Sequence, residues 1–469
     1  MGNSGSTQLQ ACLNGVANGR SGFVGYPSNP LYQIQWVKPY NLDVHVTPAA
    51  VVRPETAQDV SNIIICAKES GVKVQAKSGG HSFGNYGLGG VDGAVAIDMV
   101  KFDKFEMNNS TFEATIGAGL RLGKVDKLLH AQGGRAFAHG VCPDVGVGGH
   151  ATIGGLGPMS RMWGSALDHV VEVEVVTADG KIQRASKQEN PNLFWSLRGA
   201  AASFGVITEF KFRTHPEPKS IVQYSYSFSF GKQEDMAPIY ATWQNLVADP
   251  KLDRRFGTMF IMYPLGAIIT GSFYGTPQEY EASGIPQRLP KNGKQTLAIN
   301  DWLGSIAHDA ENEALYLSNI ATPFYAKSLA FNNKTLIPTE KFPSLFKWVD
   351  QQEKGTILWF IIFDASGGAV SDVPMDGTSY SHRDKILFYQ SYAIGLPLAK
   401  KSKDFLTNFH NEVLKAAPGA AGTYAGYVDP GLGQAGPTEY WGPNLNKLRS
   451  NKQFYDPTDV FHNPQSVPL

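Results

Sequence analysis

Three absences narrow what this chain of 469 residues can be. It has no apolar run of the roughly 18 residues that a membrane helix needs, which argues against a membrane partner. It has no excess of either charge, with 41 basic and 41 acidic residues, so its charge does not favour binding to nucleic acid or to an anionic membrane. It also lacks the metalloprotease pattern H-E-x-x-H and the P-loop pattern G-x-x-x-x-G-K-S/T, which disfavours both of those enzyme classes.

Cysteine is scarce as well. Cys12, Cys66 and Cys142 make an odd number, and one pair with one separate thiol is the simplest arrangement. The three cysteines are too far apart in sequence for a C-x-x-C site, and the histidines are scattered. We therefore expect no bound metal.

The length and the 42% hydrophobic content predict two domains. Early in the chain, short β-like runs alternate with a helical run that Thr56 can cap and Gly71 can end, which predicts a βαβ unit. Farther on, Asp179-Gly180 joins two β-rich runs and predicts a hairpin. The prolines of THPEPKS mark a boundary, so we assign residues 1–217 to the first domain.

Beyond this boundary the sequence changes character. Aromatic, partly alternating segments such as IVQYSYSFSF and KILFYQSYAIG are separated by helical stretches. This pattern predicts an antiparallel sheet covered by helices over residues 218–428. The tail, residues 429–469, is polar and punctuated by proline, and we expect it to return to the first domain. The expected fold class is therefore α+β with two domains.

Glycine, in contrast, is abundant. The chain has 50 glycines, which cluster at 77–93, 117–123 and 140–157. Backbone N–H groups without a crowding Cβ can converge on an anion, so three such loops predict a diphosphate held by main chain. The glycines of GAGLRLG are spaced one residue too far apart for the dinucleotide fingerprint, which disfavours a Rossmann dehydrogenase. Glycine used only for tight turns is the alternative.

Two of these stretches carry a resemblance to a known family. KSGGHSFGNYG and, some sixty residues later, GVCPDVGVGGHATIGGLG resemble the signature of berberine-bridge-enzyme-like oxidases. These belong to the vanillyl-alcohol-oxidase (PCMH-type) group of FAD-linked enzymes and include fungal glucooligosaccharide and chitooligosaccharide oxidases. The segment NLFWSLRGAAASFGVITEF and the tail match the same family. The resemblance implies an FAD domain with two small α/β subdomains, a substrate domain with a large sheet, and oxidation of an alcohol by FAD.

The resemblance also implies how FAD is held. His81 would bond to the 8α-methyl carbon of the flavin and Cys142 to C6, although a histidine in a glycine turn more often only stabilises the turn. Cys12 and Cys66 would form a disulfide, which indicates an oxidising compartment. We therefore expect a secreted, extracellular protein, although no signal peptide is visible in this chain. The other cofactor contacts implied by the resemblance are Ser78, Gly79, Gly80, Ser82, Val145, Gly146, Gly149, Gly154, Gly155, Val206 and Asn444.

Oxidising an alcohol requires a base that takes the hydroxyl proton as the hydride leaves. The resemblance implies that Tyr427 is this base, with Tyr424 beside it and Asp364 as its acidic partner. A free phenol titrates at about 10, so Tyr427 needs surroundings that favour the phenolate. A nearby carboxylate would raise the pKa of the tyrosine, so we expect Asp364 to accept a hydrogen bond or to relay the proton. Val145 stands where oxidases of the family tend to carry valine, which implies oxygen as the electron acceptor and hydrogen peroxide as a product.

The expected substrate contacts depart from those of the sugar-oxidising relatives. Gln390 matches a glutamine that contacts the sugar. Phe83, Ile362 and Ile261, however, stand where the relatives have tyrosine, glutamine and glutamate, and each change removes a group that binds a hydroxyl. A desolvated hydroxyl without a partner costs roughly 1–3 kcal/mol. Stacking on Tyr424 or Trp441 could still hold a sugar.

Three interpretations of the function are open. The first is an oxidase that takes hydride from the anomeric hydroxyl of an oligosaccharide. The second is the same flavin chemistry on a less polar alcohol or a secondary metabolite. The third is a flavin-loaded protein without turnover that acts as a binder. In each case we expect a monomer whose partners are small molecules, with oxygen among them for an oxidase.

Overall fold

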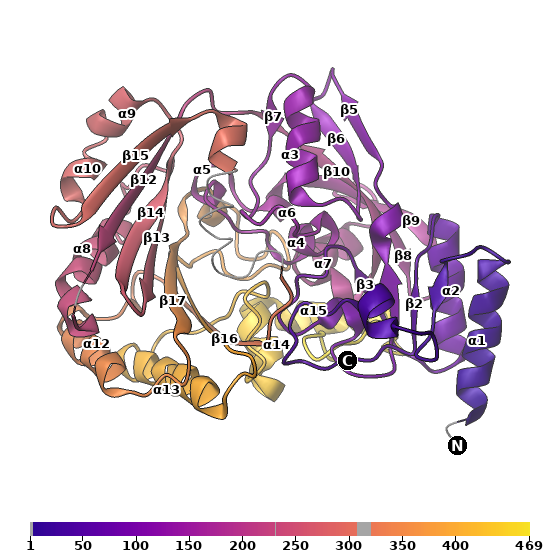
Figure 1. The fold of residues 1–469 in the computed structure, drawn as a ribbon. Coiled ribbons are helices and arrows are strands. Elements are labelled where there is room, and N and C mark those ends of the chain that lie inside the picture. Colours follow the sequence, from indigo (N-terminus) through magenta and orange to yellow (C-terminus); the bar gives the residue numbers. More distant parts are fainter. Residues whose placement is uncertain (1–2, 230, 307–319) are drawn as a thin grey trace.

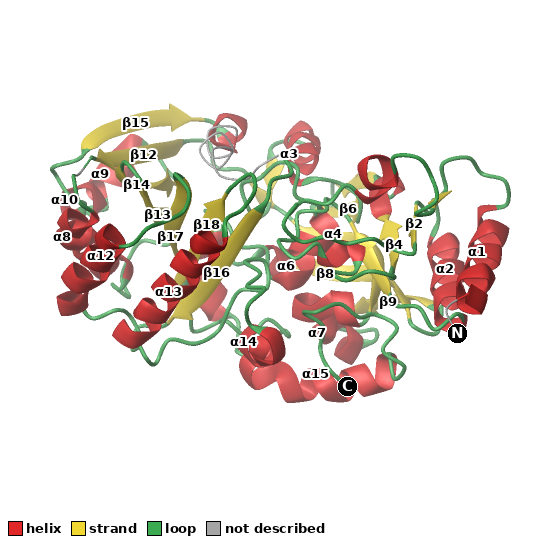
Figure 2. Cartoon of the chain, turned by 60° about the horizontal axis from the view of Figure 1, so that its bottom comes forward, coloured by secondary structure: helices red, strands yellow, loops and turns green. Residues whose placement is uncertain are grey.

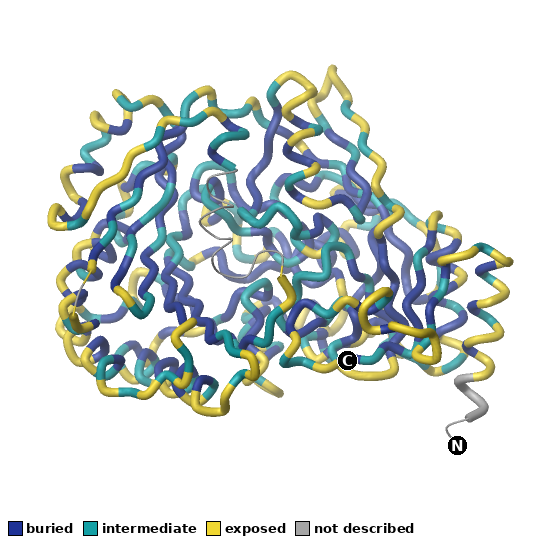
Figure 3. Tube along the Cα trace, in the orientation of Figure 1, coloured by how far each residue is buried: buried dark blue, intermediate teal, exposed yellow. Residues whose placement is uncertain are grey.

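A computed structural model describes residues 3–229, 231–306 and 320–469 of the chain. Figure 1 shows two halves side by side, with several small sheets in the N-terminal half and one large sheet in the other. Figure 2 shows the large sheet from another side, with helices along its outer face. The buried backbone runs through both halves in Figure 3. The α+β architecture expected from the sequence is confirmed.

The first sheet contains the predicted βαβ unit. Helix α2 (Ala57–Glu69) connects strands β2 and β3, and Thr56 caps it by accepting a hydrogen bond from Asp59 N at 3.1 Å. Strand β4 lies between β2 and β3 and is parallel to both. The disulfide Cys12–Cys66 joins helix α1 (Asn3–Ala17) to α2, as predicted. In the order β1-β2-β4-β3, the strands are β1 (Val24–Gly25), β2 (Ala50–Val52), β4 (Val95–Asp98) and β3 (Val74–Lys77).

The second sheet is antiparallel, and its strands follow the order β5-β6-β10-β8-β9. The predicted hairpin at Asp179-Gly180 joins β8 and β9. A two-stranded sheet of β7 and β11 completes this half. The strands are β5 (Phe105–Asn108), β6 (Glu113–Gly117), β7 (Arg135–Ala136), β8 (Val170–Thr177), β9 (Ile182–Ser186), β10 (Gly205–Arg213) and β11 (His215–Pro216). The helices are α3 (Leu122–Ala131), α4 (Val147–Ile153), α5 (Ser160–Trp163), α6 (Ala166–His169) and α7 (Pro191–Ala200).

The large sheet has seven antiparallel strands in the order β15-β12-β14-β13-β17-β18-β16. Two strands were not predicted. Strand β15 is mostly exposed and so lacks the alternation of a half-buried strand, whereas β16 is buried on both faces, as the predicted β18 also is. The strands are β12 (Ile221–Phe228), β13 (Phe256–Tyr263), β14 (Gly266–Phe273), β15 (Lys294–Asn300), β16 (Phe324–Phe331), β17 (Leu358–Ala365) and β18 (Leu387–Ile394).

Helices cover the outer face of this sheet. Trp243 of α8, Phe346 of α12 and Phe409 of α13 are fully buried in the core that these helices form with the strands. The aromatic side chains on one face of the strands pack against these helices. The side chains on the opposite face therefore point towards the N-terminal half. The helices are α8 (Ala237–Val247), α9 (Pro277–Ala282), α10 (Ile285–Arg288), α12 (Phe342–Gln351) and α13 (Lys400–Ala416).

The tail forms α14 (Gly436–Trp441) and α15 (Leu445–Tyr455). Leu448, Phe461 and Val467 lie in the same hydrophobic core as the first two sheets, and Val74 N donates to Val460 O at 2.9 Å. The tail therefore packs against the N-terminal half of the chain. Within the described part of the chain, no helix is both long and apolar enough to cross a bilayer.

Candidate active site

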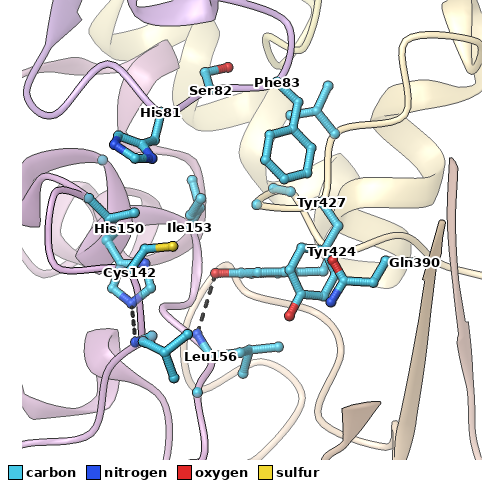
Figure 4. Close-up of a pocket in the computed structure, with 18 of the residues that line it drawn as sticks. His81, Ser82, Phe83, Cys142, His150, Ile153, Leu156, Gln390, Tyr424 and Tyr427 are labelled. Carbon is cyan, nitrogen blue, oxygen red and sulfur yellow. Dashed lines mark hydrogen bonds between the residues drawn. The ribbon is translucent and has the colours of Figure 1, made fainter. Parts of the chain in front are cut away.

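A cavity of about 400 Å³ separates two walls of different construction. We call the first the glycine wall; it consists of residues 77–82 and 140–149. We call the second the sheet wall; it consists of the cavity-facing side chains of β13, β14, β17 and β18 together with Tyr427. Figure 4 shows His81 and Cys142 on one side of this cavity and Gln390, Tyr424 and Tyr427 on the other.

The two loops of the glycine wall meet backbone to backbone. A Cβ added to Gly79 would overlap the N atom of Gly146, and one added to Gly146 would overlap the N atom of Gly79. Ser78 strengthens this contact, since its Oγ donates to Ala118 O at 2.6 Å and accepts from Gly148 N at 3.3 Å. Glycine is therefore required at both positions by the close approach of the two chains.

The first loop presents unpaired donors to the cavity. The backbone N–H groups of residues 79–82 find no acceptor among the described residues, although all four residues line the cavity. Gly80 adopts φ +80°, which lets successive N–H groups turn towards one point. Such a concave set of donors binds the oxygen atoms of a phosphate or diphosphate. The glycine wall thus fits the diphosphate of FAD.

His81 and Cys142 project from these two loops. Burial, and next the positive charge of Arg121, lower the pKa of His81 to about 4, with Asp144 acting in the opposite direction. The imidazole is therefore neutral at neutral pH and has a nitrogen lone pair free to form a bond. Arg121 also ties the loops together by donating to Gly79 O at 3.2 Å and to Asp144 O. Cys142 is partly buried and is not in a disulfide.

The sheet wall carries a straight apolar row. Strand pairing places Ile268 of β14 beside Ile261 of β13, and Ile261 beside Ile362 of β17. Ile362 is followed by Gln390 of β18, and all four residues line the cavity. Because neighbouring residues of a row point to the same face of a sheet, the three isoleucines form one continuous apolar surface.

An aromatic cluster closes one end of this surface. The ring of Phe83 meets Phe324 edge to face at 5.3 Å between centroids and meets Tyr392 in the same way at 5.6 Å. Tyr40 packs against Phe324 at 5.7 Å and also lines the cavity. Ile261 and Ile362 belong to the same cluster. The cavity is therefore apolar on two adjoining sides.

One polar group interrupts the apolar surface. Asp364 accepts hydrogen bonds from the side chains of Gln390 and Tyr427, and Gln390 Oε1 accepts one from the hydroxyl of Tyr392. Burial raises the pKa of Asp364 to about 7, and the bonds from Gln390 and Tyr427 only partly counter this. Asp364 is therefore placed to take a proton from Tyr427 near neutral pH.

The loop that carries Tyr427 is fastened to β16. Ser328 Oγ donates to Tyr427 O at 2.7 Å, and the neighbouring Lys327 forms an ion pair with Asp429 at 2.7 Å. The side chains of this pair are 7% and 0% exposed, so its bonds are shielded from water. Tyr427 therefore projects into the cavity from a loop that is fixed to β16 at Tyr427 itself and at Asp429.

Tyr424 is engaged differently from Tyr427, although their rings lie 5.0 Å apart, edge to face. The hydroxyl of Tyr424 accepts a hydrogen bond from Gly155 N at 2.8 Å. Burial raises the pKa of Tyr424 to about 12, and the bonds from the N–H groups of Gly155 and Leu156 partly oppose this. Tyr424 thus anchors the loop that follows α4, and its phenol is unsuited to be a base near neutral pH.

The structure brings most of the predicted site residues together. These line the cavity: Ser78, Gly79, Gly80, His81, Ser82, Phe83, Cys142, Val145, Gly146, Gly149, Ile261, Ile362, Asp364, Gln390, Tyr424 and Tyr427.

Four predicted cofactor contacts, however, do not line it. Gly154 and Gly155 pack against Tyr424, and Val206 is buried within the sheet of β10. Asn444 uses its amide to donate to Met375 O at 2.8 Å and to Thr378 O at 3.2 Å. The suggestion that Trp441 stacks on a substrate is wrong, because its ring is buried and donates to Gly199 O at 3.2 Å.

Several lining residues were not predicted. Tyr392 could have been found from Gln390, since residues two apart on a strand point to the same face. Met259, Ser225 and Thr270 follow from strand pairing and needed the sheet order. Tyr40 carries no signal in its own stretch of sequence. No group of three metal-binding side chains occurs among residues that the structure describes.

Comparison with known proteins identifies relatives over nearly the whole chain. Residues 48–186 match the family model described as FAD binding domain, and residues 423–468 match the model described as Berberine and berberine like. The FAD-linked oxidoreductase sorD of Penicillium rubens is 38% identical, over 99% of each chain. The chitooligosaccharide oxidase of Gibberella zeae is 33% identical, over 91% of this chain and 89% of that protein.

Solved structures agree with these sequence relatives. The glucooligosaccharide oxidase of Acremonium strictum superimposes with a TM-score of 0.87 at 28% identity, covering 98% of this chain and 99% of the other. That oxidase contains a 6-S-cysteinyl, 8α-N1-histidyl FAD. The predicted two-domain vanillyl-alcohol-oxidase fold is thereby confirmed.

Proposed function

Because the chain belongs to the berberine-bridge-enzyme-like FAD-linked oxidases, we propose that it takes hydride from an alcohol carried on a largely apolar body and passes the electrons to oxygen. One observation carries the choice of substrate: the continuous surface of Ile268, Ile261 and Ile362 beside Tyr427. The third interpretation, a binder without turnover, is not supported for a member of this oxidase family.

The proposal includes an FAD bound covalently through both His81 and Cys142. His81 has a neutral imidazole, Cys142 has a thiol outside the disulfide, and both face one cavity. The doubly linked FAD of the glucooligosaccharide oxidase supports the same arrangement here. The disulfide Cys12–Cys66 supports an oxidising, extracellular setting.

When bound, FAD supplies the acceptor for the hydride. The residues of this chain supply the proton path. Tyr427 takes the proton of the substrate hydroxyl, and the hydrogen bond from Tyr427 to Asp364 lets the carboxylate receive the proton that the phenol gives up. Gln390 and Tyr392 hold Asp364 in place, because Tyr392 donates a hydrogen bond to Gln390 and Gln390 donates one to Asp364.

The apolar wall favours a substrate with few hydroxyls. A sugar ring pressed against three isoleucines would leave hydroxyls without partners, at roughly 1–3 kcal/mol each. Gln390 offers little in place of the lost partners, because Asp364 takes one of its two N–H groups and Tyr392 takes one of the two acceptor positions of Oε1. An aromatic or aliphatic alcohol would instead gain from burying its surface against this wall.

A carbohydrate is the second candidate. Ser225 and Thr270 are cross-strand neighbours that line the cavity, and their hydroxyls could serve a sugar at the far side of the isoleucine row. The relatives named for oligosaccharide oxidation support this candidate.

Hydrogen peroxide release separates the two candidates. The enzyme would be offered benzylic, phenolic and aliphatic alcohols in parallel with mono- and oligosaccharides, with the Tyr427→Phe variant as the background. We expect the higher turnover with the apolar alcohols. Peroxide from sugars alone would replace our proposal by the second candidate.

The flavin links are tested separately. Acid-precipitated protein should stay yellow in the wild type and in the single variants His81→Ala and Cys142→Ala, and only the double variant should release its flavin. Release of flavin from the wild type would refute covalent attachment without bearing on the choice of substrate.

A further inference from the structure

Tyr40 lies outside every motif of the family signature, yet its ring stacks on His81. The two ring centroids are 4.5 Å apart and the planes are inclined by 29°. Tyr40 is 9% exposed and comes from the N-terminal segment, some 40 residues before His81 in sequence. The contact therefore depends on the tertiary fold.

His81 needs such a contact because its own loop does little to orient it. The loop has glycines on both sides of the histidine, at Gly79, Gly80 and Gly84. The imidazole makes no hydrogen bond to any described residue, and its one ring contact there is with Tyr40. The stack thus restricts the torsion angle about the Cβ–Cγ bond, which otherwise has a broad distribution in ring side chains.

Hydrogen bonds to Asn85, which lies in the loop that carries His81, hold Tyr40 in place. Asn85 Oδ1 accepts from Tyr40 N at 3.0 Å and from Asn41 N at 3.2 Å. Asn85 Nδ2 donates back to Asn41 O at 2.8 Å, and Asn85 is 1% exposed. A polar side chain this deeply buried keeps its position because breaking its bonds would leave unpaired groups.

Asn41 connects the same N-terminal segment to the large sheet through hydrogen bonds. Its Nδ2 donates to Phe83 O at 2.8 Å and to Phe324 O at 3.0 Å, and its Oδ1 accepts from Phe324 N at 3.2 Å. The loop that carries His81, the N-terminal segment and β16 therefore meet at one buried junction. These hydrogen bonds fix the position of Tyr40 relative to both halves of the molecule.

We propose that Tyr40 is the positioning residue for the covalent link between His81 and the flavin. This inference rests on the doubly linked FAD of the proposed function. In forming the link, a C–H bond of the 8α-methyl group breaks and an N–C bond to His81 forms. One proton leaves the carbon and one leaves the imidazole. The flavin takes the two electrons and passes them to oxygen, which becomes hydrogen peroxide. Tyr40 acts by holding the imidazole plane so that its nitrogen faces the methyl carbon.

The link can be measured without any substrate. Trypsin releases His81 in the peptide 78–101 and Cys142 in the peptide 136–161. In doubly linked protein one FAD joins these two peptides into a single species that mass spectrometry detects. Protein linked only through Cys142 gives peptide 136–161 with FAD and peptide 78–101 without it.

The decisive variants are Tyr40→Leu and Tyr40→Phe, made in the full-length protein and isolated with its flavin. Tyr40→Leu removes the planar ring, and we expect the joined species to fall at least about tenfold while the FAD on Cys142 stays within about twofold. Tyr40→Phe keeps the stack and should match the wild type. Tyr32→Leu is the control, because Tyr32 is a buried tyrosine of the same segment that does not contact His81.

Two other outcomes overturn the proposal, and a third overturns the proposed function on which it rests. A joined species of normal abundance in Tyr40→Leu would show that the stack is not needed. Loss of both links together, with a lower Tm, would show that Tyr40 only supports the fold, and Tyr40→Met provides a second apolar side chain for this comparison. A wild type without the joined species would refute the doubly linked flavin itself, which is distinct from failure of the inference.

Discussion

The glycine wall and the sheet wall face the same cavity, but the chain builds them by different means. The glycine wall offers backbone N–H groups, and its loops meet where no Cβ fits. The sheet wall offers side chains, which strand pairing sets in rows. A backbone surface cannot change its chemistry by substitution, whereas any side chain of a row can be exchanged with little effect on the strand. The first wall therefore suits a cofactor common to a family, and the second suits a substrate that differs between its members.

The largest expected effect comes from a change that forces the two loops of the glycine wall apart. In Gly79→Ala the new Cβ would overlap Gly146 N, so the two loops must separate and the N–H groups of residues 79–82 lose their common focus. We expect the flavin-to-protein absorbance ratio of the purified variant to fall about tenfold or more. Gly15→Ala is the matched control, since nothing lies within 4 Å of a Cβ there. A yellow Gly79→Ala protein would show that the loops tolerate separation.

Removing the base should leave the glycine wall untouched. Tyr427→Phe deletes the hydroxyl that donates to Asp364, and the backbone bond from Ser328 to Tyr427 O is kept. We expect the rate of flavin reduction, followed by stopped-flow absorbance with the substrate found in the peroxide screen, to fall about 10²- to 10⁴-fold. The flavin content should be unchanged. Tyr263→Phe, a change outside the cavity, is the control, and reduction of Tyr427→Phe at the normal rate would exclude Tyr427 as base.

A change to one side chain of the isoleucine row tests whether the sheet wall selects the substrate. Ile362→Gln places a polar amide beside Gln390 on the neighbouring strand. We expect kcat/KM for an apolar alcohol to fall about tenfold, because part of the apolar surface is lost and the new amide must find a partner. The ratio of sugar to alcohol turnover should rise. Ile299→Gln on β15, where the side chain is 65% exposed, should change neither value.

The same contrast explains what could be predicted from sequence. The glycine wall is local: KSGGHSFGNYG and GVCPDVGVGGHATIGGLG each contain a whole loop, so the motifs located His81 and Cys142 directly. The isoleucine row is assembled from three strands, and two of its members could be named only because a resemblance supplied the positions. The row itself became visible with the pairing of β13, β14 and β17.

Tyr40 shows where prediction from sequence ended. Its partners His81, Phe324 and Asn85 lie far from it along the chain, and its own surroundings, KPYNLD, contain no motif. The unpredicted strand β15 was missed for a similar reason. Its exposure follows from its place at the edge of the sheet, and it removes the alternation on which strand prediction depends.

The smallest effect concerns the one charge on the sheet wall. Folding raises the pKa of Asp364 from its usual value to about 7, so between about pH 4 and 7 the folded chain binds a proton that the unfolded chain has released. Stability from this group therefore falls as pH rises through that window and stays lower above it. Asp364→Asn cannot ionise and should be more stable than the wild type above pH 7, by about 1–4 kcal/mol, and similar to it below pH 4.

Urea denaturation of both proteins at several pH values would measure this difference. The control is Asp372→Asn, because Asp372 is exposed and forms its ion pair with Arg254 at the surface. A difference between Asp364→Asn and the wild type that does not change with pH would mean that Asp364 is ionised without cost. The carboxylate would then be too weak a base to take a proton from Tyr427, and the proton path across the sheet wall would have to run through another group.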